Sequence, residues 1–202
     1  MRMKTSRLTK IALMAALLCI ISPFAITFPF SPVPVSLATL MLYFCVYILG
    51  KCDAVISCAI YLLIGLVGIP VFSGFTGGLG KVLGPTGGYL IGYLLLVYIS
   101  GCFVEKWSQS SKNGNLRNAE IRSYCYLNYF MQGIGMILGT VVCYFFGSLW
   151  LCYQSGMAFT VALSVGVLPF IPGDAVKLVT GVIIGNAMRK RLVRVGFLTI
   201  GS

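Results

Sequence analysis

Long apolar runs, separated by short polar or proline-containing stretches, dominate the chain. They cover residues 8–28, 35–50, 53–69, 87–104 and 123–146, and a last run extends from 172 or 173 to 192. Several approach the roughly 20 residues that an α-helix needs to cross a bilayer. The pattern predicts an all-α integral membrane protein with six transmembrane helices, in a single domain over residues 1–202.

Prolines decide how the two ends of this pattern are read. A proline-rich turn at residues 29–34 follows the first run, so we expect that run to stay in the membrane and not to be cleaved as a signal peptide. Near the other end, Pro169 and Pro172 favour a helix that begins at about residue 172, because proline is tolerated in the first helical turn. The stretch 157–168 is then too short to cross, and we expect a short interfacial helix there.

Composition and charge place this fold in a membrane. Hydrophobic residues make up 58% of the chain and charged residues 9%, whereas roughly a quarter of the residues of a soluble domain are charged. All Lys and Arg residues except Lys81 and Lys177 fall on one side of the six-span arrangement. By the positive-inside rule, both termini and a polar loop at 105–122 are expected on the cytoplasmic side. The membrane is expected to be the plasma membrane of the cell. This asymmetry explains the net charge of +11 without nucleic acid as a partner.

The available side chains argue against catalysis. The chain has no histidine and only four acids, Asp53, Glu105, Glu120 and Asp174. Most metal centres and any histidine-activated nucleophile are therefore excluded, and we expect no enzyme, no metal and no cofactor. The eight cysteines form no C-x-x-C pair and fall mostly within apolar runs, which is typical of core residues.

Asp174 and Lys177 are the only opposite charges within one expected span, and their i, i+3 spacing places them on one helix face. An ionisable side chain within the membrane costs roughly 2.5 to 3.5 kcal/mol on insertion scales and usually faces the protein interior or a cavity. Asp174 could simply cap the helix, with Lys177 as its neutralising partner. A lysine in the first turns opposes the helix dipole, however, so a ligand-facing pair is favoured.

A glycine-rich segment at 73–89, SGFTGGLGKVLGPTGGY, carries the single lysine expected outside, Lys81. It could be a plain flexible turn. It is not a phosphate loop, because Val82 stands where Ser or Thr is required. Its glycines let the backbone approach a ligand, so we expect residues 70–86 to form a lid over an external pocket for an anionic small molecule.

Two further groups of residues are candidates for function. Tyr89 and Tyr93 in the fourth run, and Gln132 in the fifth, are candidate pocket-lining residues. Small residues recur at i, i+4 within the runs, a pattern that lets helix backbones approach closely. These pairs are Ala12 with Ala16, Gly88 with Gly92, Gly135 with Gly139, and Gly181 with Gly185.

Four stretches resemble the BioY family, the biotin-binding S components of energy-coupling factor transporters. They are PVPVSLATL at 32–40, GLVGIPVF at 65–72, GGLGKVLGPTGGYLIG at 77–92 and LPFIPGDAVKL at 168–178. The resemblance covers nearly the whole chain, and the combination of GPTGGY with PGD-x-x-K is specific. One departure is Ala38, where many relatives have glutamine.

The resemblance implies a six-helix protein that captures biotin from outside. It also implies two kinds of partner, a transmembrane coupling protein and a pair of cytoplasmic ATPase subunits. The substrate-binding acid and lysine of the family fall on Asp174 and Lys177, and its coupling motif falls on Ala12 and Ala16.

The chemistry of biotin fits these assignments. Asp174 can accept hydrogen bonds from the ureido N–H groups, Lys177 can donate to the ureido carbonyl, and Lys81 can meet the carboxylate. Thr86 and Tyr89 of the GPTGGY stretch, together with Gln132, complete the expected substrate-binding set.

Other functions remain to be separated from this one. The chain could bind another vitamin, or transport biotin without an ATPase module. A channel lined by Asp174 and Lys177 would need an oligomer at this chain length. An intramembrane enzyme is disfavoured by the missing histidines.

Overall fold

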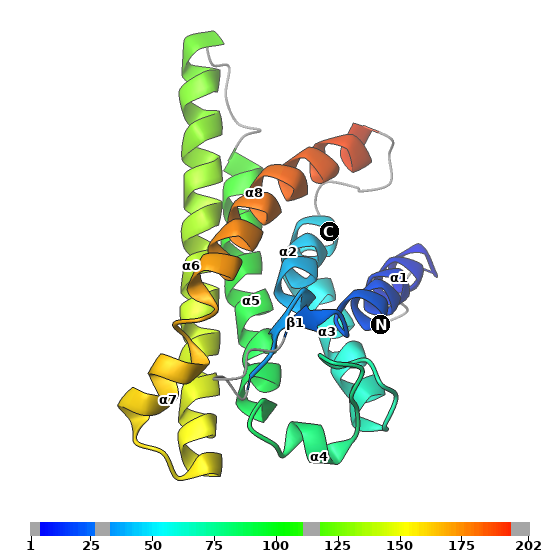
Figure 1. Ribbon diagram of the computed structural model, residues 1–202. Helices are drawn as coiled ribbons and strands as arrows, with labels where there is room; N and C mark the ends of the chain where they lie inside the picture. The colour runs from blue at the N-terminus through cyan, green and yellow to red at the C-terminus, as the bar shows by residue number, and fades with distance from the viewer. Residues whose placement is uncertain (1–4, 27–32, 111–117, 195–202) are drawn as a thin grey trace.

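The computed structural model describes residues 5–26, 33–110 and 118–194, and these are almost entirely helical (Figure 1). The elements in chain order are α1 (Thr5–Ile21), β1 (Ala25–Ile26), β2 (Val35–Ser36), α2 (Ala38–Leu49), α3 (Lys51–Leu66), α4 (Leu79–Val82), α5 (Gly87–Ser110), α6 (Asn118–Ser155), α7 (Phe159–Gly166) and α8 (Ile171–Arg194). Each expected apolar run therefore contains a helix. The expected short helix before the last run is α7, and α8 begins one residue before Pro172.

Fewer helices are long and apolar enough to cross a membrane than the sequence pattern predicts. Within the described residues, Gly87–Trp107 and Leu127–Ser155 are long and apolar enough to cross a membrane, and α7 with α8 make a third span if this pair, bent by 55°, is counted as one. At 12 residues, α2 is about 18 Å long, well short of the ~30 Å hydrocarbon core. Six crossings are therefore not established. Residues 29 and 32 of the proline-rich turn, and 111–117 of the polar loop, lie outside the described residues.

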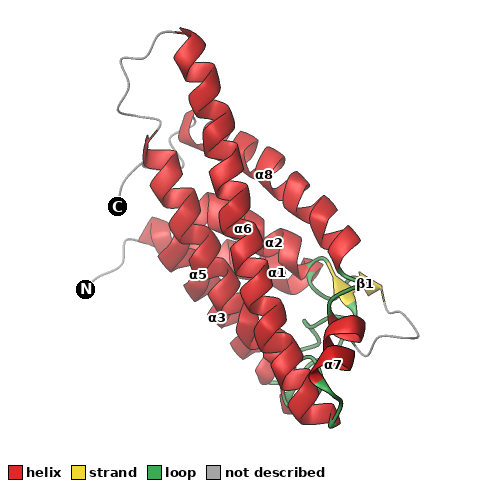
Figure 2. Ribbon diagram, turned by 90° about the vertical axis from the view of Figure 1, so that its left-hand side faces the viewer, coloured by secondary structure: helices red, strands yellow, loops and turns green. Residues whose placement is uncertain are grey.

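Two long antiparallel helices, α5 and α6, make the most extensive helix–helix contact of the bundle (Figure 2). Along their seam Gly88 lies against Trp150, Gly92 against Cys143, and Gly135 of α6 against the ring of Phe103. A Cβ on Gly92 would approach Cys143 Sγ to 2.9 Å, so the missing side chain sets the distance between the two helices. The i, i+4 glycines therefore pack helices together, as the sequence predicts.

Helix α2 occupies the centre of the bundle, where it packs against α1, α3, α5 and α8. Its sequence is apolar on all sides, and a helix of that kind is buried rather than amphipathic. Tyr43 and Tyr47 of α2 are fully buried. They pack over Gly181 and Gly185 of α8, which offer no side chain to hold them off.

The expectation of a purely helical chain is wrong in one detail, because β1 and β2 form a two-stranded antiparallel ribbon. Ala25 pairs with Ser36, and Ile26 pairs with Val35. Proline at 34 disfavours the α conformation for the residue before it and keeps this segment extended. Ser36 then fixes the ribbon to the end of α1, since its hydroxyl donates to the carbonyl of Ser22 at 2.8 Å.

The glycine-rich segment is folded by its own backbone hydrogen bonds. Phe72 and Thr76 exchange backbone bonds of 2.8 and 3.3 Å, and the N–H of Gly78 donates to the carbonyl of Gly65 at 2.7 Å. Gly78 has a φ of +87°, which other residues rarely adopt. Trp150 of α6 holds the end of the segment by donating to the carbonyl of Gly84 at 2.9 Å. These hydrogen bonds give the segment a defined conformation in the structure.

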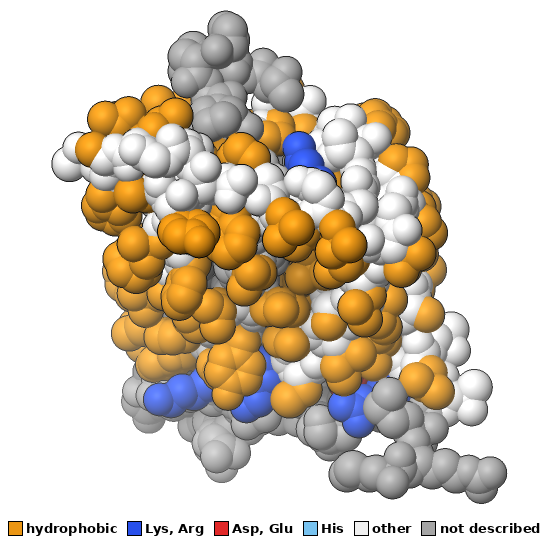
Figure 3. All heavy atoms as spheres, turned by 90° about the horizontal axis from the view of Figure 1, so that it is seen from below, with side chains coloured by type: hydrophobic (Ala, Val, Ile, Leu, Met, Phe, Trp, Pro, Cys, Tyr) orange, Lys and Arg blue, Asp and Glu red, His pale blue; other side chains and the backbone are white. Residues whose placement is uncertain are grey.

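The outer surface is apolar, as expected of a membrane protein. Large apolar side chains are exposed on several helices, among them Phe130 of α6 and Val176 and Ile183 of α8. Figure 3 shows apolar side chains over most of the face that it displays. Ala12 and Ala16 of α1 also lie exposed, while Ala15 between them is buried.

The contact between α2 and α8 generates a stability prediction. A Cβ on Gly185 would lie 2.1 Å from Cδ2 of the fully buried Tyr47. We expect Gly185→Ala to destabilise the purified protein by about 1–3 kcal/mol, through overpacking, as a lower unfolding temperature in detergent. The matched control is Gly133→Ala on α6, where nothing lies within 4 Å of the added methyl. Equal unfolding temperatures for the two variants would contradict the close α2–α8 contact.

Candidate functional site

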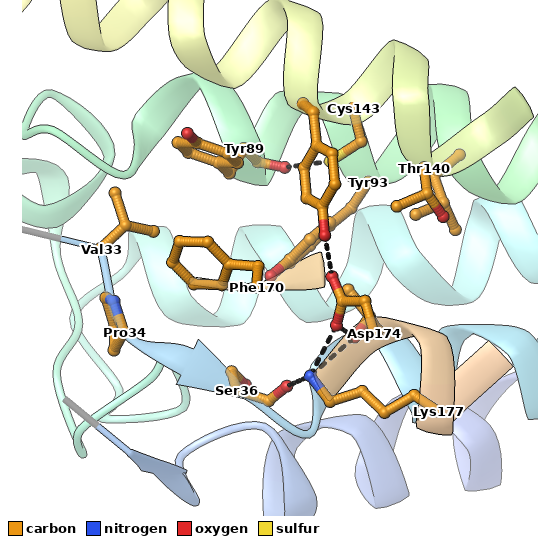
Figure 4. A pocket seen from close by; sticks show the side chains of 13 residues that line it. Val33, Pro34, Ser36, Tyr89, Tyr93, Thr140, Cys143, Phe170, Asp174 and Lys177 are labelled. Carbon is orange, nitrogen blue, oxygen red and sulfur yellow. Dashed lines mark hydrogen bonds and ion pairs between the residues drawn. The ribbon is translucent and has the colours of Figure 1, made fainter. Parts of the chain in front are cut away.

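A pocket opens between the β1–β2 ribbon and helices α2, α5, α6 and α8 (Figure 4). Its walls differ in character, since charged and hydroxyl groups gather on one side and aromatic and apolar side chains on the other. The lining residues are Val33, Pro34, Ser36, Thr39, Tyr89, Tyr93, Leu96, Thr140, Cys143, Tyr144, Phe170, Asp174 and Lys177. The pocket therefore suits a ligand with a polar head and an apolar body.

The charged side of the pocket is the pair formed by Asp174 and Lys177. Both side chains are buried, and Lys177 Nζ lies 2.8 Å from Asp174 Oδ1. The prediction that the two share one face of the last helix is therefore confirmed. Lys177 Nζ also donates to the carbonyl of Ser36 at 2.6 Å, which ties α8 to the ribbon. Figure 4 shows both interactions on the pocket wall.

Asp174 does more than cap its helix, because side chains from two other helices donate to its carboxylate. Thr39 of α2 lies 3.4 Å from Oδ1, and the hydroxyl of Tyr144 of α6 donates to Oδ2. Thr39 also accepts from Lys177 Nζ at 3.3 Å. A buried charge is stable only when it is paired and hydrogen-bonded. The pair meets this condition through its bonds to Ser36, Thr39 and Tyr144, and these bonds hold β2, α2, α6 and α8 together.

The aromatic side of the pocket is fixed by contacts to α6 and α7. Tyr89 is buried, and its hydroxyl donates to the carbonyl of Gly166 at 2.9 Å, close to the end of α7. Gly147 of α6 lies against the Tyr89 ring, where a Cβ would clash at 2.3 Å. Tyr93 and Phe170 complete this wall. The hydroxyl of Tyr89 is thus engaged within the protein, and its ring faces the ligand space.

The structure brings only part of the expected site together. Asp174, Lys177 and Tyr89 line the pocket, whereas Lys81, Thr86 and Gln132 are not among its lining residues. None of the residues 70–86 expected to form a lid lines it either.

Lys81 and Thr86 lie in the glycine-rich segment and contact each other. The hydroxyl of Thr86 donates to the backbone carbonyl of Lys81 at 3.3 Å, so Thr86 closes the turn that carries the lysine. Partial burial lowers the pKa of Lys81 below its ordinary value of 10.5. The segment contacts the turn just before β1, because Gly74 N–H donates to the carbonyl of Pro23 at 2.9 Å and the rings of Phe24 and Phe75 meet edge to face.

Gln132 faces the bundle interior, as expected, but its partners are protein groups. Its Oε1 accepts from Tyr47 at 3.0 Å and from Asn186 Nδ2 at 2.7 Å. Asn186 of α8 also donates to the hydroxyl of Tyr47 at 3.2 Å, so the cluster ties α2, α6 and α8 together. The sequence indicates that Gln132 points inward, but not which neighbours it meets.

The sequence analysis missed the three pocket residues that bond to the ion pair, namely Ser36, Thr39 and Tyr144. Ser36 and Thr39 lie within the PVPVSLATL stretch, so the resemblance contained a signal for them. Tyr144 lies in a run with many aromatic residues, and nothing in its local sequence distinguishes it from a lipid-facing tyrosine. Ala38 is buried, and its N–H donates to Ser36 Oγ at 3.0 Å, so the residue that departs from the family pattern does not line the pocket.

The fold and the site together define a class of protein: a helical membrane protein with a buried, charge-balanced pocket where four helices meet the β1–β2 ribbon. A model of the BioY family matches residues 1–194. The chain belongs to the BioY family.

Individual relatives and a solved structure agree with this assignment. The chain is 33% identical to the probable biotin transporter BioY of Pyrococcus horikoshii over 187 residues, which cover 93% of this chain and 98% of that protein. It is 32% identical to the biotin transporter BioY of Thermotoga maritima, over 82% of this chain and 86% of that one. A crystal structure of the S-component for biotin from an ECF-type ABC transporter superposes with a TM-score of 0.78 at 30% identity, over 94% of this chain and 95% of that one. The relatives are transporters, in agreement with the expectation that the chain is not an enzyme.

Proposed function

We propose that this protein is the membrane subunit that binds biotin for its uptake into the cell. The observation that carries the proposal is the buried Asp174–Lys177 pair on one wall of a pocket whose opposite wall is aromatic and apolar. The names of its relatives and of the superposed structure support biotin as the substrate.

The chemistry of biotin matches the two sides of the pocket. Its ureido group carries N–H donors for the Asp174 carboxylate and a carbonyl that accepts from Lys177. Its sulfur-containing ring and the methylene chain of its valerate are apolar and suit the side of the pocket that Tyr93 and Phe170 line. Hydrogen bonds to charged partners are the strong ones in such a site.

We extend the proposal to six membrane crossings with both termini in the cytoplasm of the cell. Support comes from the basic end of α8, where Arg191 and Arg194 fall in the last turn, and from the distribution of lysine and arginine along the chain. The short helix α2 crosses in this arrangement at the centre of the bundle, where neighbouring helices and not lipid surround it. The whole chain then forms one membrane domain.

We also propose that the glycine-rich segment 70–86 closes the pocket from outside and that Lys81 meets the biotin carboxylate. The hydrogen bond between Gly74 and Pro23 and the contact between Phe24 and Phe75 support this role, because they join the segment to the turn that leads into the β1–β2 ribbon, whose Ser36 lines the pocket. The role of Thr86 is to hold the turn at Lys81.

The partners that we propose are a transmembrane coupling protein and a pair of cytoplasmic ATPases. Support comes from α1, where Ala12 and Ala16 leave a shallow exposed surface of the kind that another helix can approach closely. The helix is held on α3, since Arg7 forms an ion pair with Asp53 and Ser57 Oγ donates to the carbonyl of Ile11 at 3.2 Å. Uptake against a gradient needs such a module or an ion gradient, because a chain without a nucleotide-binding motif cannot couple ATP hydrolysis by itself.

Equilibrium binding of labelled biotin to the purified protein tests the central proposal. We expect saturable binding that excess unlabelled biotin abolishes and that other water-soluble vitamins leave unchanged. Displacement by another vitamin, with none by biotin, would overturn it in favour of a different substrate. Uptake by proteoliposomes, with and without the ATPase module, separates a subunit from a solitary transporter.

The first functional prediction concerns the acid of the pair. Asp174→Asn keeps the size of the side chain but removes the charge that accepts ligand N–H groups. We expect biotin affinity to fall by about tenfold or more, measured by equilibrium binding, while the variant still purifies as a folded protein. Unchanged affinity would remove Asp174 from the binding site.

The second prediction concerns Lys81 and pH. Lys81→Ala should weaken binding of biotin more than binding of biotin amide, because only biotin presents a carboxylate. Since burial lowers the pKa of Lys81 below 10.5, the positive charge of Lys81 is lost as pH rises through that lowered pKa. Biotin affinity should therefore fall in alkaline buffer in the wild type but not in Lys81→Ala. Equal losses for biotin and its amide would show that Lys81 only orders the segment.

The third prediction concerns the exposed face of α1. Ala12→Trp and Ala16→Trp should abolish ATP-dependent uptake in proteoliposomes while the isolated variants still bind biotin, because neither residue lines the pocket. Ala15→Trp is the matched contrast, since Ala15 is buried and its enlargement should lower the unfolding temperature. Loss of biotin binding together with uptake in the Ala12 and Ala16 variants would refute a coupling role.

A further inference from the structure

The two carboxylate oxygens of Asp174 accept different numbers of hydrogen bonds. Oδ1 accepts from Lys177 Nζ at 2.8 Å and lies 3.4 Å from the hydroxyl of Thr39. Oδ2 accepts from the hydroxyl of Tyr144. A carboxylate oxygen offers about two acceptor positions. Within the described residues, Oδ1 is therefore filled by protein donors, and Oδ2 keeps one open acceptor position.

Tyr144 decides where this open position points. The carboxylate belongs to α8 and the phenol to α6, so this bond is the described link between Asp174 and the helix on the far side of the pocket. Thr39 of α2 and Lys177 contact Oδ1, and because the carboxylate is planar and rigid, these contacts and the Tyr144 hydroxyl together fix its rotation about the Cβ–Cγ bond. Without the Tyr144 hydroxyl the carboxylate would be held through Oδ1 alone, and the range of directions open to Oδ2 would widen.

The charges around the open position add up to zero. Lys177 neutralises Asp174, and the other two side chains that contact the carboxylate, Thr39 and Tyr144, are uncharged. A neutral ligand head preserves this balance, whereas a cationic or anionic head would leave one buried charge without a partner. Burial of an unpaired charge carries a large free-energy cost.

We propose that Tyr144 is a positioning residue for ligand recognition, which directs the open acceptor position of Asp174 Oδ2 at the ligand. The class of head group selected in this way is neutral and carries an N–H donor. This inference rests on the proposed function, because it concerns how the same pocket recognises biotin.

A double-mutant cycle tests the role of Tyr144. Tyr144→Phe removes only the hydroxyl and should lower biotin affinity by about tenfold. If Tyr144 acts through Asp174, the double variant Tyr144→Phe with Asp174→Asn should bind no more than about threefold more weakly than Asp174→Asn alone, because effects that share one interaction do not add. The matched control is Tyr93→Phe, a second pocket hydroxyl without a described bond to Asp174, whose effect should multiply with that of Asp174→Asn.

The outcomes of this cycle are distinct. Multiplying losses for Tyr144→Phe and Asp174→Asn, or full affinity of Tyr144→Phe, would overturn the positioning role while the wild type still binds biotin. Failure of the wild type itself to bind biotin would overturn the proposed function instead. Unfolding temperatures of all variants without ligand are measured first.

A second measurement needs no variant. An analogue in which the ureido carbonyl of biotin is replaced by C=NH is a cation at neutral pH but keeps the ring N–H groups. We expect it to compete at least tenfold more weakly than biotin for the wild-type protein. Equal competition would show that the pocket does not require a neutral head, and the inference would fall even if Tyr144→Phe did not fold.

Discussion

The pocket of this protein depends on one buried ion pair, between Asp174 and Lys177. Two charges removed from water are stable only when their remaining hydrogen-bonding capacity is used. The fold meets this need from elements far apart in the chain, since Ser36 of β2 accepts from the lysine and Tyr144 of α6 donates to the acid. The helices must therefore meet at this point, and the glycines of α5, α6 and α8 allow them to approach closely enough. Binding chemistry and tertiary packing share the same contacts.

Much of the architecture follows from the sequence, because the period and length of apolar runs report on helices directly. The short helix α7 and the start of α8 next to Pro172 were predicted from proline chemistry, and both are observed. The β1–β2 ribbon was not predicted, since two-residue strands are stabilised by their partners and have no pattern of their own. The number of membrane crossings is also not set by the runs, because the environment of a helix as short as α2 depends on its neighbours.

The site was predictable to the extent that its chemistry is unusual in a membrane. A charged pair in an apolar run stands out, and Asp174 and Lys177 lie where the spacing indicates. Tyr144 does not stand out, because tyrosine is common in such runs and its role depends on the rotation of α6 against α8. Gln132 shows the converse. It is a conspicuous polar residue, yet Tyr47 and Asn186 engage it within the bundle.

The placement of both charges on a single helix has a consequence for motion. Asp174 and Lys177 are three residues apart on α8, so a rigid displacement of that helix carries the two together. Their contacts to Ser36, Thr39 and Tyr144 belong to other elements and would break in the same step. The charge balance of the site thus depends on α8 alone, whereas the shape of the pocket depends on several elements. A displacement of α8 would therefore separate the pair from the other pocket elements without separating the two charges from each other.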